Sequence, residues 1–517
     1  MTVNELLAKN VEHHPEKVYV YFRDQALTYG EFDLITNKIA NGLVKLGVKK
    51  GNKVSIMLPN SLEFLYTLFG CFKIGAVIVP INLAFSAEEV EYVVNHSEAV
   101  VLVTDAQYLN TVNKVRPELK LLKTIVVVAD EVADKSVYLF SNLIKEQSTE
   151  RPKIEVKGED EISMIYTSGT TGKPKGVVLT HHAYASAARA WNESIGIKTH
   201  DLPMSVLSLF HINAQLYFAI GAMDIDTGFV LEERFSSSKF WKRAVETNAT
   251  IACLPGNALV MLDNMPESED EKKHKIRVMI SAYTPIDLYR KFEKRFHLDI
   301  IEGYTLTESP SALFNRPGDV RVGAIGKPMS CVEAKIINEN DKEVPQGEVG
   351  EIALRGPSVM KEYFKNPEAT SEALREGWLH TGDLGRVDHE GYFYFAGRKK
   401  DIIRRGGENI GAQEVEEVLN FHPKIAESAV IPVPDRVRNE EIKAYLIVKP
   451  GETIEPKEII RYCEGRLADF KVPRYIEFID SFPKTAKMTV QKHILKQLKK
   501  DHTIGCYDRE ANREGKK

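Results

Sequence analysis

The stretch YTSGTTGKPKGVVLTH, residues 166–181, concentrates groups that can bind an anion. Between Thr167 and Gly176 it holds three glycines, four Ser/Thr hydroxyls and two lysines. Glycines let backbone amides approach an anion closely, hydroxyls donate to phosphate oxygens, and lysines supply positive charge. This chemistry fits a polyphosphate, and the candidate contacts are Thr167, Ser168, Gly169, Thr170, Thr171, Gly172, Lys173 and Lys175.

We expect this loop to turn between two strands, because ISMIY before it and GVVLT after it are both apolar. Pro174 lacks an amide donor and disfavours helical angles at Lys173, so the loop does not open a helix. It is not a Walker A motif, because Thr167 stands where that motif needs glycine and Pro174 where it needs Ser or Thr. A flexible surface turn is the alternative for a short Gly/Ser/Thr cluster. The length of the ordered run favours phosphate binding.

The elements around the loop alternate between helix and strand. Residues 28–47 open with Thr28 and Glu31 at capping-box spacing, continue with apolar residues at helical spacing and end at Gly47. Apolar runs at 53–58, 76–81, 99–104 and 124–129 are typical of buried strands. The most apolar stretch, 65–81, contains Lys73 and is shorter than the roughly 18–20 apolar residues of a membrane span. It is therefore predicted to be a core helix followed by a core strand.

The expected secondary structure changes twice toward the C-terminus. Short strands and Gly/Pro/Asp turns dominate around residues 320–400, and a helix-strand mixture follows. We predict an α/β protein whose large N-terminal domain, residues 1–398, has αβ-layered subdomains and a small β-barrel-like part. A small α+β C-terminal domain, residues 399–500, and a loose tail, residues 501–517, complete the chain.

Composition limits the function classes. The net charge of -4 and a pI near 6.4, without a basic arm, do not indicate nucleic acid as a partner. The five cysteines are odd in number and scattered, which is typical of a reducing compartment. The N-terminus lacks the basic-then-apolar layout of a signal peptide. We expect a cytoplasmic protein that is not integral to a membrane.

The loop and four later motifs, in this order, resemble the adenylate-forming superfamily of acyl-CoA synthetases, luciferases and peptide-synthetase adenylation domains. LSLFHINAQ (207–215) resembles the segment lining the acyl pocket, and EGYTLTES (302–309) the block that holds nucleotide and metal. GWLHTGDLG (377–385) resembles the ribose-binding block, and GRKKDIIRRGGENIGAQEVE (397–416) the hinge and the start of a mobile C-terminal domain. FHINAQ, NRPGDVRVGAIG, RRGGEN and FKVPRYIEF resemble the crotonobetaine/carnitine-CoA ligases in particular.

The residues of the nucleotide block have chemistry that suits ATP. Glu308 offers a hard oxygen ligand for Mg²⁺, with the Thr167 hydroxyl as a second candidate ligand. The resemblance places Thr307 in the same nucleotide contact, and Tyr304 could pack on adenine. Taken alone, a Thr-Glu pair is usually a solvated loop or helix start, and most tyrosines belong to the core.

The ribose block and the hinge supply the remaining nucleotide and coenzyme A contacts. Asp383 can accept both ribose hydroxyls, although an Asp in TGD is more often a turn residue. Arg398 can reach ribose or phosphate, the alternative being a surface ion pair. The resemblance implies that Lys400 is the hinge and that Gly406 and Gly407 leave room for the thiol arm of coenzyme A.

The acyl-substrate contacts rest on the resemblance. It implies that His211 gates the carboxylate pocket, with Asn213 in the same segment, whereas a lone His in LFHI would more often be a satisfied core residue. Tyr283, in SAYTPI, replaces the small residue that relatives often carry there. It either narrows the pocket near adenine or the acyl head, or is packing.

The chain departs from the family near its C-terminus. Family members usually carry a lysine in a P-(R/K)-T-x-(S/T)-G-K run, and FPKTAKMTVQKHILK (482–496) places Thr489 at that position. Threonine cannot supply the missing charge. Lys487 substitutes for it, or the enzyme adenylates slowly yet transfers thioesters, or the chain only binds nucleotide or acyl-CoA.

The sequence therefore predicts an ATP-dependent, AMP-forming acyl-CoA synthetase that uses a carboxylic acid, ATP with Mg²⁺, and coenzyme A. The alternatives are an adenylation enzyme that loads a carrier protein and a catalytically impaired binding paralogue. Carnitine-like acids and fatty acids are both open as substrates. The oligomeric state is open too, a homodimer included.

Overall fold

The computed structural model describes residues 1–167, 174–282, 284, 286–405, 408–484 and 490–511. The chain forms two compact units. The larger comprises Met1–Ala334, Leu354–Leu379 and Gly391–Phe393, and the smaller Lys335–Ala353, His380–Glu390 and Tyr394–Lys517. The units thus divide the region around residues 335–393 between them, and the single boundary expected after Arg398 stays a prediction.

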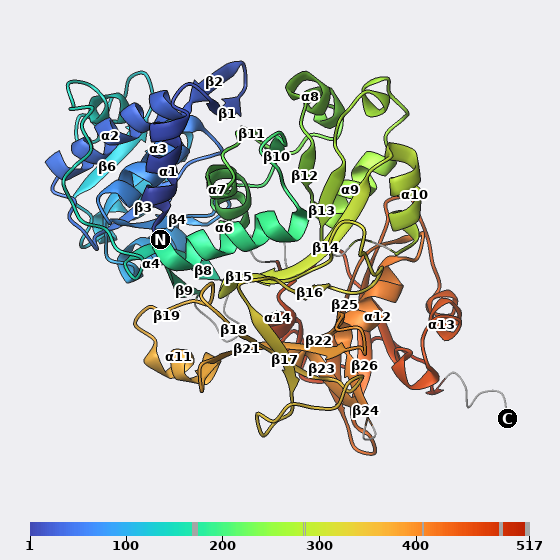
Figure 1. The fold of residues 1–517 in the computed structure, drawn as a ribbon. Coiled ribbons are helices and arrows are strands. Elements are labelled where there is room, and N and C mark those ends of the chain that lie inside the picture. Colours follow the sequence, from blue (N-terminus) through green and yellow to red (C-terminus); the bar gives the residue numbers. More distant parts are fainter. Residues whose placement is uncertain (168–173, 283, 285, 406–407, 485–489, 512–517) are drawn as a thin grey trace. The chain divides into compact units, whose positions relative to one another are not determined.

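The larger unit contains an eight-stranded sheet in the order β19-β9-β8-β4-β3-β5-β6-β7 (Figure 1). It is parallel from β8 to β7 and antiparallel where β9 joins β8 and β19. The strands are β3 (Lys53–Met57), β4 (Val77–Pro80), β5 (Ala99–Asp105), β6 (Thr124–Val128), β7 (Tyr138–Leu139), β8 (Glu161–Thr167), β9 (Lys175–Thr180) and β19 (Glu362–Tyr363).

The same unit contains a nine-stranded sheet in the order β16-β15-β14-β13-β12-β10-β11-β1-β2. Its middle, from β14 to β1, is parallel, and both ends are antiparallel. The strands are β1 (Val18–Phe22), β2 (Gln25–Thr28), β10 (Pro203–Ser205), β11 (Phe229–Leu231), β12 (Ile251–Cys253), β13 (Val278–Ser281), β14 (Asp299–Leu306), β15 (Ser309–Phe314) and β16 (Lys327–Pro328).

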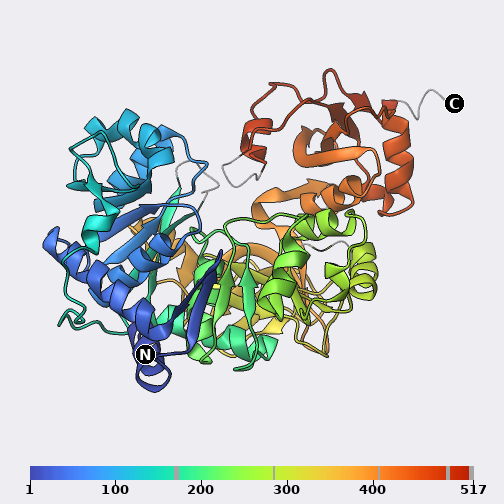
Figure 2. The same ribbon diagram turned by 90° about the horizontal axis from the view of Figure 1, so that it is seen from above.

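Helices cover both faces of the parallel strands, as such strands require. In Figure 2 the blue helices α2 and α3 lie on one face of the eight-stranded sheet and the cyan α4 and α5 on the other. The helices are α1 (Val3–His13), α2 (Tyr29–Lys45), α3 (Leu62–Lys73), α4 (Ala87–His96), α5 (Leu109–Val115), α6 (His181–Ile195), α7 (Gly221–Asp224), α8 (Phe240–Thr247), α9 (Gly256–Asp263), α10 (Ile286–Phe296) and α11 (Pro367–Ala373). The predicted αβ-layered architecture is confirmed.

Local sequence signals explain where these helices begin and end. The capping box predicted for α2 is present: the Glu31 amide donates to Thr28 Oγ1 (3.2 Å), and the Thr28 amide to Glu31 Oε2 (2.9 Å). Lys73 ends α3 inside the core and is 2 % exposed. Its ammonium reaches Asp33 Oδ1 and Asn37 Oδ1, both at 2.6 Å. The charge that interrupts the apolar stretch is therefore paired with α2.

The smaller unit contains a six-stranded sheet in the order β24-β23-β26-β27-β28, with β25 also paired to β26. Its strands and helices are β23 (Ile402–Arg405), β24 (Glu408–Gly411), α12 (Ala412–Asn420), β25 (Ile425–Asp435), β26 (Asn439–Val448), α13 (Pro456–Glu464), β27 (Tyr475–Phe478), α14 (Lys492–Leu495) and β28 (Tyr507–Asp508). Apolar side chains of β23, β25 and β26 pack against α12 and α13 as its core. The expected α+β character is observed.

A five-stranded sheet corresponds to the part expected to be barrel-like. Its order is β17-β18-β21-β20, with β22 also paired to β21, so within the described residues it is open rather than closed. The strands are β17 (Glu333–Ile337), β18 (Gly350–Arg355), β20 (Leu374–Arg375), β21 (Trp378–Val387) and β22 (Phe393–Arg398).

The segment expected to be a loose tail is packed as far as residue 511. Its strand β28 pairs antiparallel with β27. Arg509, only 5 % exposed, places Nη2 3.2 Å from Glu464 Oε1 and donates from Nη1 to the Asp469 carbonyl (3.2 Å). Arg474 also binds Asp508 through two 3.2 Å contacts. These charge pairs act together with Tyr507 and Cys506, which pack against the apolar clusters of the smaller unit. The division of the chain at residue 501 stays a prediction.

None of the helices in the described part of the chain combines the length and the apolar run that a bilayer crossing demands.

Candidate active site

The predicted phosphate loop connects two antiparallel strands of the eight-stranded sheet. β8 ends at Thr167 and β9 begins at Lys175, and these two residues face each other in the register. The Tyr92 hydroxyl donates to the Pro174 carbonyl (3.0 Å), which attaches the end of the loop to α4. The prediction of a strand-loop-strand hairpin is confirmed. Residues 168–173, which include Ser168, Gly169, Thr170, Thr171, Gly172 and Lys173, lie outside the described residues.

A short strand from much later in the chain lies beside β9. β19 pairs antiparallel with it, Tyr363 opposite Val177, and the amides of Lys361 and Phe364 donate to carbonyls of β9. Tyr363 is 6 % exposed, and its hydroxyl donates to Glu308 Oε1 (2.8 Å). The Met360 amide donates to the Glu308 carbonyl, also at 2.8 Å. Glu308 is therefore held by both the side chain and the backbone of the segment that flanks the phosphate hairpin.

The same tyrosine ring supports Lys175. The Lys175 ammonium lies 4.0 Å from the centroid of the Tyr363 ring, a cation–π contact. Burial raises the pKa of the Tyr363 hydroxyl well above its usual range, and the neighbouring Glu308 charge raises it further. The hydroxyl therefore remains a neutral donor throughout the physiological range. Sequence reasoning missed Tyr363, because no spacing near it signals a partner about 55 residues away.

The segment predicted to line the acyl pocket is held in place by buried amides. Asn60 donates to the Leu207 carbonyl (2.9 Å) and accepts from the Leu209 amide (2.7 Å). Gln215 donates to the Leu209 carbonyl (2.7 Å) and accepts from Tyr184 (3.0 Å). Four fixed polar contacts in a span of nine residues leave the segment little freedom, which suits a binding wall.

This segment continues into a π-helix, Ala214–Ile220, whose N-cap is Asn213. π-helices are rare and often occur at functional sites. Asn213 Nδ2 lies 3.5 Å from Thr305 Oγ1, so the acyl segment meets the EGYTLTES block. His211 is partly buried, with its ring 4.4 Å from that of Phe210. Asn213 and His211 thus belong to the segment predicted to line the acyl pocket, and their contact with the acid stays a prediction.

The EGYTLTES block forms the end of β14 and the turn into β15. Tyr304 is 8 % exposed and pairs with Leu313 across β14 and β15. Thr307 and Glu308 form the turn between those strands and are partly buried. The Thr284 amide donates to Glu302 Oε1 (3.0 Å), which fixes the start of the block. Tyr304, Thr307 and Glu308 therefore come from one rigid hairpin.

The predicted ribose residues lie in the smaller unit and contact each other. Arg398 Nε lies 3.2 Å from Asp383 Oδ1, and the Asp383 side chain is 10 % exposed. The Thr381 hydroxyl accepts from the Asp383 amide (3.1 Å), and Glu351 accepts from the Gly382 amide (2.8 Å). The arrangement fixes the Asp383 carboxylate with a cation at its side, which is the geometry of an anchored acceptor for hydroxyls.

Several predicted contacts fall where the structure gives no placement. Tyr283, Gly406, Gly407, Lys487 and Thr489 lie outside the described residues, and of Lys400 only the backbone is described. Their roles stay predictions.

The residues present fit a magnesium ion brought in with ATP. Glu308 is partly buried, and within the described part of the chain its second oxygen, Oε2, accepts no hydrogen bond. Those described residues hold no group of three or more His, Cys, Asp or Glu side chains that could cage a metal. Mg²⁺ commonly takes one or two carboxylates and completes its shell with substrate phosphates and water. One carboxylate beside a phosphate-binding loop therefore suits an Mg²⁺ site whose remaining ligands are substrate phosphates and water.

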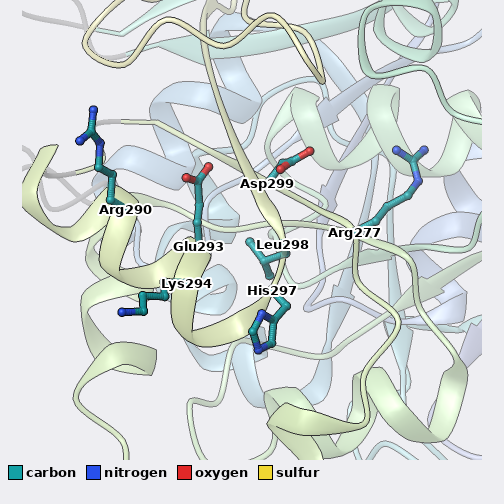
Figure 3. A pocket seen from close by; sticks show the side chains of 7 residues that line it. All are labelled: Arg277, Arg290, Glu293, Lys294, His297, Leu298 and Asp299. Carbon is teal, nitrogen blue, oxygen red and sulfur yellow. The ribbon is translucent and has the colours of Figure 1, made fainter.

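A separate surface cavity of about 530 Å³ lies at the other end of β14 (Figure 3). Basic and acidic side chains of α10 and the start of β14 line it, together with Arg277. Asp299, at the first residue of β14, lies in this lining, whereas Tyr304 lies near the last. The cavity therefore does not belong to the nucleotide block.

Two α/β sheets, a strand-loop-strand hairpin with a carboxylate beside it, and a second α+β unit are the arrangement expected of an adenylate-forming enzyme. The AMP-binding enzyme family model matches residues 7–364, and the AMP-binding enzyme C-terminal domain model matches residues 414–488. The chain belongs to the AMP-binding enzyme family.

Individual relatives cover almost the whole chain. Crotonobetaine/carnitine–CoA ligase of Shigella flexneri is 36 % identical over 91 % of this chain and 93 % of its own length. An anthranilate CoA ligase solved with anthranoyl-AMP has a TM-score of 0.88 at 29 % identity and covers 96 % of this chain and 97 % of its own. O-succinylbenzoate coenzyme A synthetase from Bacillus subtilis, solved with ATP and a magnesium ion, has a TM-score of 0.84 at 28 % identity, covering 95 % and 99 %. The predicted superfamily, and its AMP-forming CoA ligase class, are confirmed.

Proposed function

We propose that this protein is an ATP-dependent acid–thiol ligase that converts a carboxylic acid, ATP and coenzyme A into acyl-CoA, AMP and pyrophosphate. The observation that carries the assignment is the joint attachment of Glu308 and Lys175 to Tyr363, next to the phosphate hairpin, in an AMP-binding enzyme. This arrangement presents one carboxylate and one ammonium beside a loop rich in hydroxyls and glycine. It suits a metal-bound triphosphate.

In the first half-reaction the substrate carboxylate attacks the α-phosphorus of ATP. A bond forms between the carboxylate oxygen and phosphorus, and the bond to the pyrophosphate oxygen breaks. The hairpin from Thr167 to Lys175 binds the triphosphate, and Lys175 offsets its charge. Glu308 would hold Mg²⁺, with the Thr167 hydroxyl as the second candidate ligand, and the ion would neutralise charge on the phosphate oxygens.

Four residues of the nucleotide and ribose motifs orient the nucleoside, each in its own role. Tyr304 packs on adenine, and Thr307 contacts the nucleotide from the same hairpin. Asp383 accepts the two ribose hydroxyls, and Arg398 holds that carboxylate in place.

In the second half-reaction the coenzyme A thiolate attacks the carbonyl carbon of the acyl-adenylate, and AMP leaves with the anhydride oxygen. Gly406 and Gly407 leave room for the pantetheine arm. Residues 399–500 act as a mobile C-terminal domain hinged at Lys400. His211 and Asn213 receive the acid, and Tyr283 limits the space around it.

We propose a small acid of the carnitine type as the substrate, with fatty acids as the alternative class. Similarity to crotonobetaine/carnitine–CoA ligases over 91 % of the chain supports this order. We place the reaction in the cytoplasm, since all five cysteines are free thiols. A homodimer stays a proposal that size measurement can test.

The test is a substrate panel on the purified protein. Carnitine, crotonobetaine, fatty acids of increasing length and an aromatic acid are supplied with ATP and Mg²⁺, and pyrophosphate, AMP and acyl-CoA are measured. Pyrophosphate that depends on acid, followed by acyl-CoA with free coenzyme A, is expected. Acyl transfer only to a carrier protein would indicate the carrier-loading alternative. ATP binding without pyrophosphate for every acid would indicate the impaired binding protein.

A further inference from the structure

Tyr363 touches both charged groups that the proposed reaction needs next to the triphosphate. Its hydroxyl donates to Glu308 Oε1 (2.8 Å), and the Lys175 ammonium lies 4.0 Å from its ring centroid. Within the described part of the chain neither Lys175 nor Glu308 has an ion-pair partner. The Tyr363 hydroxyl therefore contacts the Glu308 carboxylate, and the face of its ring contacts the Lys175 ammonium.

This arrangement keeps the two charges from neutralising each other. A lysine and a glutamate that meet directly form an ion pair, and each would then be less available to a ligand. The hydroxyl satisfies one oxygen of Glu308 and leaves Oε2 for a metal. The aromatic face attracts the ammonium without using its hydrogen-bond donors, so these remain for phosphate oxygens.

The backbone fixes Tyr363 as firmly as its side chain contacts do. β19 pairs with β9 at Tyr363 and Val177, so the ring is tied to the strand that begins at Lys175. The Tyr363 amide donates to Thr370 Oγ1 (3.0 Å) in α11. The residue is 6 % exposed and has little room to turn away.

We propose that Tyr363 is a positioning residue that presents Glu308 Oε2 to the metal of Mg–ATP and Lys175 to the phosphates. The proposal rests on the proposed function, since it requires Glu308 to face the metal. It assigns the hydroxyl and the ring separate tasks: the hydroxyl governs the metal-dependent part of ATP binding, and the ring governs the part that needs no metal.

The test measures binding of ATP by calorimetry, with and without Mg²⁺ and without acid, so that no turnover occurs. Tyr363→Phe removes the hydroxyl and keeps the ring. We expect the gain in ATP affinity on adding Mg²⁺ to fall by about tenfold, the scale of one hydrogen bond to a charged group. Affinity without Mg²⁺ should stay unchanged.

A second substitution separates the ring from the hydroxyl. Tyr363→Leu removes both, so affinity without Mg²⁺ should also fall, by roughly two- to fivefold. Tyr29→Phe is the matched control, because Tyr29 is also buried and donates to the Thr227 carbonyl (2.6 Å) far from the hairpin in sequence. Its binding should equal that of the wild type at both metal conditions.

Glu308→Asp tests the same contact from the other side and does not depend on Tyr363→Phe being stable. The shorter carboxylate keeps its charge but withdraws from the tyrosine hydroxyl, so a similar loss of the Mg²⁺-dependent gain is expected. An unchanged Mg²⁺ dependence in either Tyr363→Phe or Glu308→Asp overturns the positioning role. Equal losses with and without Mg²⁺ in Tyr363→Phe overturn it as well. If the wild type binds no ATP, the proposed function itself fails.

Discussion

Some polar or ionisable side chains of this protein are buried in apolar surroundings, where a charge is strongly unfavourable. His181, the first residue of α6, has no exposed surface, and both ring nitrogens lack a hydrogen-bond partner among the described residues. Its ring meets the edge of Phe72 at 5.7 Å between centroids. Burial lowers the pKa of His181 to about 4. The imidazole is therefore neutral in the folded protein at physiological pH.

His181 makes stability depend on pH. Between its unfolded pKa of about 6.5 and its folded pKa of about 4, the unfolded chain binds a proton that the folded chain does not. Stability is therefore complete above pH 6.5 and falls as the pH drops toward 4, by up to roughly 3 kcal/mol. His181→Leu should flatten this part of the curve in urea unfolding at a series of pH values. His182→Leu, at an exposed neighbouring position, should leave the slope as it is.

Sequence reasoning identifies residues whose signal is local. Thr28 and Glu31 predicted the start of α2, and the Gly/hydroxyl loop between two apolar runs predicted the β8–β9 hairpin. In the sequence Lys73 is visible only as a charge that interrupts an apolar stretch. Its ion pair could not be predicted, because its partner Asp33 lies 40 residues away. Tyr363 gave no signal at all, since its role follows from β19 joining β9. Long-range pairing is the information that periodicity and spacing do not carry.

At the scale of elements, a short strand from later in the chain completes an edge of two of the sheets. β19 adds to β9 in the larger unit, and β28 adds to β27 in the smaller. Each edge strand is two residues long and needs side-chain contacts to stay in place. Tyr363 serves β19 in this way, and Arg509 serves β28 through Glu464 and Asp469.

Arg509→Ala should loosen the C-terminal edge of the smaller unit. The side chain is 6 % exposed, so its removal takes away a buried cation and its contacts, at a cost of about 1–3 kcal/mol. Amide hydrogen exchange in the whole protein should become faster in β27 and β28 while the larger unit is unchanged. Arg436→Ala, at an exposed position, is the control. Unchanged exchange in β27 would mean that residues 501–511 contribute nothing to the unit.

At the scale of the whole molecule, one chain must support two half-reactions with separate demands. Adenylation needs positive charge at the α-phosphate, and thioester formation needs access for the coenzyme A thiol. The predicted lysine position carries Thr489, so we expect adenylation to be the slower step. Sequence and fold establish the enzyme class. The residues expected to set the relative rates of adenylation and thioester formation, Lys487 and Thr489, lie outside the described residues.

Thr489→Lys should raise acid-dependent pyrophosphate formation more than it raises transfer from a preformed acyl-adenylate to coenzyme A. The restored charge acts on the first transition state and is worth about a hundredfold or more in rate, on the scale of one oxyanion contact. Lys487→Ala is the companion variant: abolished adenylation would make Lys487 the working residue. If neither change alters adenylation, the account of residues 482–496 is wrong.

The most direct measurement of the central claim compares Glu308→Gln with the wild type in acid-dependent pyrophosphate formation across a range of Mg²⁺ concentrations. The substitution keeps the shape and removes the charge, so the rate should fall at least a hundredfold at limiting Mg²⁺ and recover in part as Mg²⁺ rises. Glu131→Gln, at an exposed position, should behave as the wild type. A Glu308→Gln enzyme with the wild-type rate and wild-type Mg²⁺ dependence would contradict the assignment of Glu308 to the metal of ATP.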